Sequence, residues 1–472
     1  MDGMTRHTES NTSNRIVLLV VTMSFFLTPF MGSAVNIALP SIGQEFGMDA
    51  VLLAWVTTSY LLAVTVFLLP FGRIADIYGR KKIFTYGTIV FTVASLVSAL
   101  ATSAVMLIAC RVLQGIGGAM IFSTGVAILT SVFPPRERGK ALGINVAAVY
   151  LGLSLGPFLG GVLTQYAGWR SIFWLNLPLG LIIIPFLFWK LKGEWADAQG
   201  EKFDLSGSVI YGLAIIALIY GLSLLPEISG TLLTGIGVMG ILLFIWWEMK
   251  TNSPILHMDL FRYNRVFAFS NLAVLISYSA TFAVAFLLSL YLQYVKGFSP
   301  QNAGLVLVAM PIVQAIFSPY AGRLSDRVSP QILASAGMAL TTIGLGLLVF
   351  IDQQTPVLFI IVSLIVLGTG FALFSSPNTN AIMSSVDKKS YGVASGTIGT
   401  MRQLGMMFSM GISMLIISLY VGRVEITPQY HAAFTMSLKT AFIIFAVLCF
   451  GGVFASLARG KAPKSPEIKY AR

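Results

Sequence analysis

The stretch GRIADIYGRKK, residues 72–82, carries five charged side chains in a chain of 472 residues of which only 10% are charged. Long apolar runs precede and follow it. A shorter copy, GRLSDR, begins 250 positions later at residue 322, again between apolar runs. A chain so poor in charge that repeats this arrangement is expected to turn twice at a water-facing membrane surface.

Composition supports that interpretation, because 56% of the residues are hydrophobic and a soluble protein would carry about 25% charged residues. Fourteen apolar segments of about 20 residues or more are long enough to span a bilayer as helices. We therefore expect an all-α polytopic membrane protein with 14 transmembrane helices. The expected spans are 16–39, 51–71, 83–100, 104–129, 140–166, 171–189, 205–225, 232–249, 266–294, 300–321, 331–350, 357–374, 392–420 and 438–457.

The basic residues orient these spans. With a cytoplasmic N-terminus, twenty-four of the thirty Lys and Arg fall in inner tails and loops and four in outer loops or span edges. This asymmetry is typical of the positive-inside rule. The net charge of +12 is thus interpreted as a topology signal, and no nucleic-acid partner is expected. We expect a multi-pass protein of the cell membrane with both termini cytoplasmic.

Internal repeats divide the chain. GRIAD and GRLSD each follow the second span of a six-span block, and RGKALG (residues 138–143) and YGVASG (391–396) each open the fifth. The two offsets, 250 and 253, fit a duplication with one small loop change, and such halves commonly frame a substrate path. The expected division is a cytoplasmic tail (1–14), an N-terminal six-helix bundle (15–190), a linker with two extra spans (191–258), a C-terminal six-helix bundle (259–458) and a cytoplasmic tail (459–472).

Several motifs now carry a family resemblance. GRIADIYGRKK resembles the loop signature of the major facilitator superfamily, RVLQGIGGA (residues 111–119) its span-four motif, and GLSLGPFLGG (152–161) its span-five antiporter motif. With fourteen spans, the chain is most similar to the drug:proton antiporter branch. The resemblance implies the major facilitator fold and secondary active transport by alternating access. Within that branch it implies multidrug-type efflux of lipophilic compounds, a drug-resistance activity, coupled to protons.

The repeated loop is expected to form a conformational latch. Gly72 should let the chain turn as the second span ends, and Asp76 can accept hydrogen bonds from the free amides of the next helix or from Arg73 and Arg80. The resemblance implies that the loop latches the two halves together on the cytoplasmic side when the cavity opens outward, with Gly322 and Asp326 as the second copy. The alternative is that these charges only orient the spans and cap helices.

The fifth span contains small residues at helical spacing. Gly152, Gly156 and Gly160 remove side chains so that two helices can approach closely, and Pro157 can bend the helix. The resemblance implies a flexible seam that seals or opens as the halves move. Ordinary helix packing is the alternative.

Two arginines lie well inside spans, at a cost of about 3 kcal/mol on insertion scales. Arg111 has Gln114 three residues on, on the same helix side, and Arg402 lies about 16 Å into its span, near the midplane. We expect these three residues to serve transport or coupling. A polar tether to neighbouring carbonyls is the alternative for Arg111, and a structural role is the alternative for Arg402.

The chain departs from the family at the first span. Met31, in FMGSAVNIALP (residues 30–40), occupies the position where this branch usually carries an aspartate, and none of the eighteen acids falls in the middle of a span. The sequence therefore favours neutral lipophilic or anionic substrates over dications. Proton coupling would need an acid at a span edge, such as Asp76. An exporter of an anionic or neutral metabolite, with different or no proton coupling, stays open.

Other polar residues could line the substrate cavity, and no catalytic, metal or cofactor site is expected. Both cysteines fall in apolar runs, and no intramembrane His, Asp or Glu supplies an enzyme constellation, so we expect no enzyme, metal or cofactor. Residues 189–205 are expected to be a solvated linker, and the protein a monomer with a small-molecule substrate. The cavity candidates are Asn36, Trp55, Tyr60, Asn145, Gln293, Gln314, Asn378 and Gln403.

Overall fold

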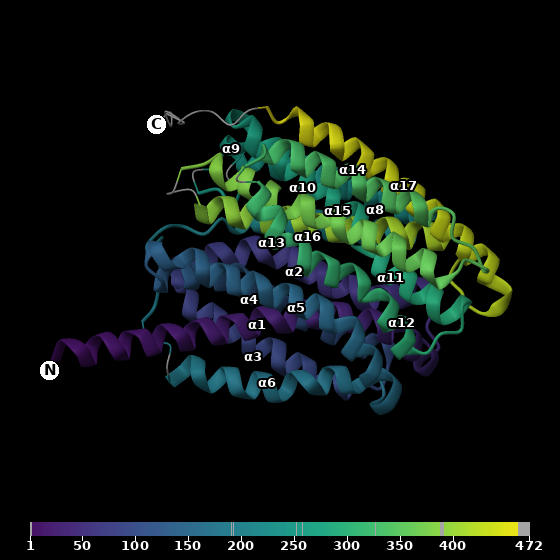
Figure 1. Ribbon diagram of the computed structural model, residues 1–472, viewed down its shortest axis with the longest axis horizontal. Helices are drawn as coiled ribbons and strands as arrows, with labels where there is room; N and C mark the ends of the chain where they lie inside the picture. The colour runs from purple at the N-terminus through teal and green to yellow at the C-terminus, as the bar shows by residue number, and fades with distance from the viewer. Residues whose placement is uncertain are drawn as a thin grey trace.

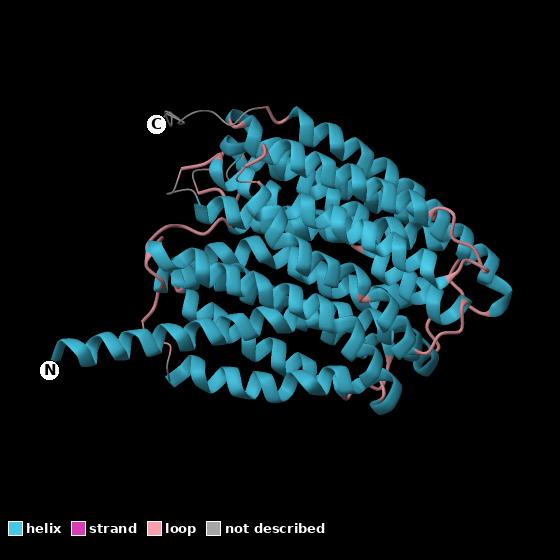
Figure 2. Ribbon diagram, in the orientation of Figure 1, coloured by secondary structure: helices cyan, strands magenta, loops and turns pink. Residues whose placement is uncertain are grey.

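The computed structural model describes residues 2–189, 191, 193–251, 253–256, 258–325, 327–387 and 391–460. Within those ranges the regular structure is helical and no strand occurs (Figure 2). Fourteen helices or helix pairs are long and apolar enough to cross a membrane, which confirms the predicted fold class. We call the end of the bundle with the start of α1 the inner end and the opposite end the outer end (Figure 1).

The first eight spans are single helices. They are α1 (Asp2–Phe46), α2 (Ala50–Tyr78), α3 (Arg80–Ala99), α4 (Ala104–Val132), α5 (Pro135–Ala167), α6 (Arg170–Trp189), α7 (Leu205–Leu224) and α8 (Ile228–Glu248). Each matches one expected span, although α1 and α2 run several residues further than hydropathy indicated.

The last six spans include two broken helices. The elements are α9 (Met258–Tyr263), α10 (Arg265–Thr281), α11 (Ala283–Leu290), the π-helical turn η1 (Tyr291–Val295), α12 (Pro300–Leu307), α13 (Ala309–Leu324), α14 (Pro330–Leu348), α15 (Val357–Ser384), α16 (Tyr391–Tyr420), the short 3₁₀ turn η3 (Pro428–Tyr430) and α17 (His431–Ala458). Together α10, α11 and η1 form one span, and α12 with α13 forms the next.

Helix ends follow local capping chemistry. Asp49 caps α2 by accepting the amides of Val51 and Leu52. Ser299 caps α12, which has a proline in its first turn. Such caps satisfy amides that a helix leaves unpaired at its start.

The first six and the last six spans pack in the same order. In the first set α1 packs on α5, α4 on α2 and α3, and α6 on α3. In the second set α10 packs on α16, α15 on α13 and α14, and α17 on α14. Figure 1 shows the two sets side by side, the first in purple and blue and the second in green and yellow.

Glycine contacts recur at the predicted offsets. Gly87 and Gly117 face each other between α3 and α4, where a Cβ on either would lie 2.9 or 2.8 Å from the other's carbonyl oxygen. Gly337 and Gly370, 250 and 253 positions later, repeat this contact between α14 and α15 at 2.6 and 2.8 Å. Glycine is required at all four positions because a side chain would collide with a neighbouring backbone.

The contact between the first and fifth spans of each set recurs as well. A Cβ on Gly152 would lie 2.5 Å from the carbonyl oxygen of Phe26, and one on Gly405 would lie 2.6 Å from that of Leu275. Equivalent glycines therefore hold equivalent backbones together in both sets of six spans.

Candidate functional site

The charged turn after α2 is built around Gly79. Helix α2 continues through Gly72 to Tyr78, and Gly79 makes the turn with φ of 119°, a left-handed conformation that favours glycine. A Cβ on Gly79 would also collide with the carboxyl group of Glu194. The expectation that Gly72 makes the turn is wrong, because the helix does not end there.

Arg80 is the centre of an ion-pair cluster at this turn. Its guanidinium lies 2.7 Å from the carboxylate of Asp76 and 2.8 Å from that of Asp197, and it donates to Ser131 of α4 at 3.2 Å. The backbone carbonyl of Asp76 accepts the amide of Ala198 at 3.0 Å. The predicted Asp76–Arg80 contact therefore exists, and a second acid from the linker shares the arginine.

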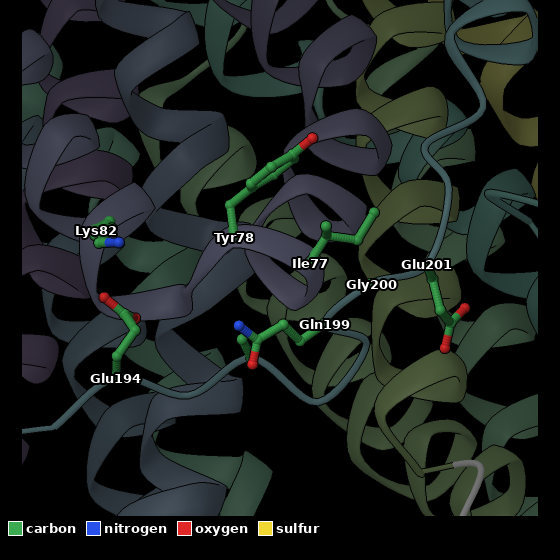
Figure 3. Close-up of a pocket in the computed structure, with 8 residues that line it drawn as sticks. Ile77, Tyr78, Lys82, Glu194, Gln199, Gly200 and Glu201 are labelled. Carbon is green, nitrogen blue, oxygen red and sulfur yellow. The ribbon is translucent and has the colours of Figure 1, made fainter.

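The segment after α6 is bound to the turn along its length, and we call residues 194–201 the linker strap. Glu194 accepts the amide of Lys81 at 2.8 Å, and Glu201 pairs with Arg73 at 2.5 Å. The strap is hydrogen-bonded to this turn, while its acids Asp197 and Glu201 stay exposed, as expected of a solvated linker. A pocket of about 610 Å³ separates part of the strap from α2 and α3, and Figure 3 labels its lining residues Ile77, Tyr78, Lys82, Glu194, Gln199, Gly200 and Glu201.

The second copy of the turn follows α13. Gly322 lies within that helix, and a Cβ there would approach the hydroxyl oxygen of Ser376 in α15 at 3.0 Å. Ser325 follows the helix and donates to the carbonyl of Gly322 at 2.7 Å. Asp326, the predicted acid of this copy, lies outside the described residues.

The glycines of the span-five motif face α1. A Cβ on Gly156 would collide with the side chain of Ser33, and one on Gly160 would lie 2.8 Å from the Cα of Ala34. On another side of α5, the carbonyl oxygen of Pro157 lies so close to Gly304 of α12 that a Cβ on Gly304 would collide with it. Helix α5 thus packs tightly against α1 of its own set and α12 of the other set.

Arg111 is fully buried inside the first set of helices. It donates to the carbonyl of Val56 at 3.0 Å and to the side-chain oxygen of Gln114, and Gln114 in turn donates to Ser95 at 2.7 Å. The guanidinium carbon lies 4.4 Å from the ring centre of Tyr60. Its Nη2 atom and the Tyr60 hydroxyl are buried without a partner in the described structure. The site is a polar network around one cation.

Arg402 lies in a different setting, half-buried on α16. It donates to Thr379 of α15 at 3.3 Å, and its guanidinium carbon lies 5.8 Å from the ring centre of Tyr278 on α10. Tyr278 packs edge-on against Phe371 at 5.2 Å. Neither Arg402 nor Arg111 forms an ion pair with any carboxylate that the structure describes.

The cavity candidates are dispersed. Trp55 packs near Tyr220 of α7, while Asn36 accepts a hydrogen bond from Thr57 within the first set. Gln293 donates across the sets to the carbonyl of Ile37 at 2.9 Å. Buried oxygens of three further candidates have no partner among the described residues, namely those of Asn145, Asn378 and Gln403. Gln314 is buried on α13, and Met31 is fully buried on α1.

Hydrogen bonds between the first and last six spans concentrate toward the outer end. Ala50 donates to the carbonyl of Val424 at 3.1 Å, and Ser289 donates to that of Asn36 at 2.7 Å. Tyr166 donates to Gln301 at 3.1 Å beside the contact of α5 with α12. The two sets therefore join where α1, α2 and α5 reach the outer end.

The inserted helix α7 covers one of the two seams between the sets. Tyr211 donates to the carbonyl of Thr65 in α2 at 3.1 Å, and Ser418 of α16 donates to that of Leu225 at 3.0 Å. The seam between α2 and α16 therefore has a third helix bound to both sides. This role of α7 was not predicted from the sequence, because apolar composition does not tell which helices a span will contact.

The inner ends of α5 and α16 meet open space. Gly139 and Gly143 of α5, and Gly392 and Gly396 of α16, have no described atom within 4 Å of the position a Cβ would take. These glycines belong to the RGKALG and YGVASG repeats. Glycines of α5 are thus tightly packed from the middle outward and open at the inner end.

Comparison with known proteins gives the family. A sequence model of the Major Facilitator Superfamily matches residues 21–410, with a second match over 270–471. The chain is 29% identical to the riboflavin transporter RibZ of Clostridioides difficile, over 94% of this chain and 96% of that one. It is 32% identical to the multidrug resistance protein Stp of Mycobacterium tuberculosis (84% and 74%) and 30% identical to the cephamycin export protein CmcT of Amycolatopsis lactamdurans (97% and 96%).

A solved structure shows the same fold at lower identity. The bacterial homologue of the human lysosomal transporter Spinster, in an inward-facing and unoccupied conformation, aligns with a TM-score of 0.65 at 17% identity, over 95% of this chain and 97% of that one. With the family match and the fourteen spans, the chain belongs to the Major Facilitator Superfamily and is a multi-pass membrane transporter of small molecules.

Proposed function

We propose that this transporter exports lipophilic small molecules from the cell by alternating access, in exchange for protons. It would lie in the cell membrane with both termini in the cytoplasm, so that the inner end faces the cytoplasm. The six-plus-two-plus-six division and its boundaries belong to this proposal. The recurring glycine contacts support it, because two bundles with the same internal packing can move as rigid bodies.

The proposed substrate class rests on the surroundings of Arg402. A half-buried cation near the midplane lies beside Tyr278 and Phe371, without an ion-pairing carboxylate among the described residues. Such a site favours neutral or anionic lipophilic compounds, since a cationic compound would meet an uncompensated like charge in a region of low dielectric constant. Arg111, in the other half of the molecule, serves as a buried polar anchor.

The latch and the open glycines support the transport cycle. The open space beside Gly143 and Gly396 at the inner end, and the hydrogen bond from Ala50 to Val424 at the outer end, support an inward-open state. In the outward-open state, the inner ends of α5 and α16 would close against the other half. Asp76 would then exchange partners as the linker strap is released.

A second candidate is the export of an anionic or neutral metabolite without proton coupling. The buried Met31, at the position where the branch usually carries an acid, favours it because no described acid stands at mid-span in place of that carboxylate.

The test is transport in inverted membrane vesicles with a panel of lipophilic compounds of different charge, with and without a pH gradient. The proposal predicts uptake of neutral and anionic compounds that the gradient accelerates. An uptake rate that does not change with the pH gradient would favour the second candidate. Uptake restricted to cationic compounds would contradict both.

A further inference from the structure

The two inserted helices end in a pair of buried carboxyl groups at the inner end. Asp204 immediately precedes α7, and Glu248 is the last residue of α8. Glu248 is only 3% exposed and Asp204 9%, although both lie beside polar connecting segments. The pair lies where the chain enters and leaves the inserted helices.

The oxygens of the pair differ in their partners. Asp204 accepts the amide of Gly207 through one oxygen and the indole N–H of Trp247 through the other, both at 2.8 Å. Glu248 accepts the amide of Leu256 at 2.9 Å through Oε2. Its other oxygen, Oε1, is buried and has no hydrogen-bond partner among the described residues. Of the four carboxyl oxygens, Oε1 of Glu248 is therefore the one that lacks a hydrogen-bond partner among the described residues.

That free oxygen lies near Asp204, across the space beside Gly207. The position of a Cβ on Gly207 lies 2.5 Å from Oδ2 of Asp204 and 2.9 Å from Oε1 of Glu248, so both oxygens surround one point. Glycine leaves room for this approach. Two ionised carboxylates so close together, away from water, would repel strongly unless a cation or a proton were present.

No described cation compensates the pair. Neither acid takes part in an ion pair between described residues. The nearest basic residues along the chain point elsewhere: Lys202 is exposed and the Lys250 ammonium lies 4.1 Å from the ring centre of Trp246. Glu201, the adjacent acid, pairs with Arg73, and His257 lies outside the described residues.

We propose that Asp204 and Glu248 together bind one proton, carried on Oε1 of Glu248 and donated in a hydrogen bond to Asp204. Binding converts the Glu248 carboxylate to the acid, with the proton taken from the inner side, and release restores two negative charges. Repulsion after release would loosen the contacts to Trp247 and Leu256, and thus the segments on either side of the inserted helices. Use of this proton in transport rests on the function proposed above, but its binding does not.

The test measures proton occupancy without substrate. Purified full-length protein in lipid nanodiscs is treated with a hydrophobic carbodiimide, which reacts with protonated carboxyl groups in apolar surroundings, over a pH series from mildly acidic to alkaline. Mass spectrometry then quantifies modification at Glu248 and, as an exposed control, at Glu227 at the other end of α8. We expect modification of Glu248 at neutral pH, with loss on further alkalinisation.

Two variants separate a proton site from a reactive side chain. Glu248→Gln keeps an acceptor for Leu256 and should lose the modified peptide. Asp204→Asn keeps the cap on α7 and removes the neighbouring charge, so the proton affinity of Glu248 should fall about tenfold or more, which moves the midpoint of modification to lower pH.

Each remaining outcome would overturn the proposal. These are modification of Glu248 no greater than that of Glu227, an unchanged midpoint in Asp204→Asn, or protection of Glu248 by sodium at constant pH, which would indicate a metal-ion site. Loss of Glu248 modification in His257→Gln would also overturn it, because proton binding would then depend on that histidine and not on Asp204 and Glu248 alone.

Discussion

At the scale of single residues, a buried cation is defined by the atoms that receive its hydrogen bonds. Arg111 and Gln114 were expected to share one helix side, and the structure adds Val56 and Ser95 as the groups that hold them. Spacing along a helix predicts such i, i+3 neighbours. It does not predict partners from other helices, which depend on how the bundle packs.

Lysine substitutions should distinguish the two arginines within spans. Arg111→Lys cannot reach Val56 and Gln114 together, so we expect a loss of about 1–3 kcal/mol of stability from an unsatisfied buried group. Arg402→Lys, at a half-buried site with one hydrogen bond, should leave stability nearly unchanged and lower the transport of anionic compounds. Thermal unfolding in detergent and vesicle transport measure the two effects. Equal destabilisation of both variants would contradict the distinction.

Arg459 shows that a basic residue just after a span can be buried. The sequence placed it with the basic tail, yet it is 2% exposed and donates to the carbonyl of Ser456 at 2.7 Å and to Ser270 at 3.2 Å. Burial lowers its pKa to about 10. A hydropathy profile assigns a residue at a helix end to water by default, whereas the side chain here folds back between α10 and α17.

At the scale of elements, the linker strap binds the residues from which the latch is built. Apolar periodicity predicted the helices on either side of it, but a polar segment has no periodic signal. Its attachment depends on Arg73 and Arg80 of α2 and α3 meeting acids more than a hundred positions away.

Releasing the strap should shift the conformational equilibrium. Exposed ion pairs contribute about 0.2–1 kcal/mol each. A triple variant, Glu194→Gln with Asp197→Asn and Glu201→Gln, removes two such pairs and weakens the hydrogen bond of Glu194 to the amide of Lys81, so it should change the population ratio several-fold. Because the strap is proposed to be released in the outward-open state, a cysteine at Gly143 should react more slowly with a membrane-impermeant maleimide in the triple variant. Faster reaction would contradict this role, since it would mean that the strap favours the outward-open state.

A substitution of Asp76 tests the latch at the same turn, in the outward-open state. Asp76→Asn weakens the contact with Arg80 and, as the proposed latch residue, should abolish transport while the protein still inserts in the membrane. The cysteine at Gly143 should then react at least as fast as in the parent. Near-normal transport by Asp76→Asn would rule out the latch.

Glycines on one helix should differ in their tolerance to a methyl group. Gly156→Ala would push α5 against Ser33 and the carbonyl of Phe30, and overpacking of this kind costs about 1–3 kcal/mol. Gly143→Ala meets open space and should gain up to about 1 kcal/mol in helix propensity. Thermal unfolding of the two variants checks the order, and a more stable Gly156→Ala protein would contradict the packing described.

At the scale of the whole molecule, duplication accounts for much that was predictable. The offsets of 250 and 253 between the repeated motifs reappear as matched contacts at Gly117 and Gly370, because copies of one packing scheme preserve their closest approaches. The asymmetric position of the inserted helix α7 could not be predicted in the same way. Helix α7 binds only one seam, and the choice of seam depends on contacts such as Tyr211 with Thr65 that follow no repeat.

The central claim is that the two bundles tilt against each other and open one end as the other closes. Spin-label distances test it directly, with one exposed pair at the inner end, Lys140 and Arg323, and one at the outer end, Gln165 and Gln354. We predict two populations in which a shorter inner distance accompanies a longer outer distance, with proportions that change with pH or a transported compound. Two distances that stay fixed, or that lengthen together, would contradict the account.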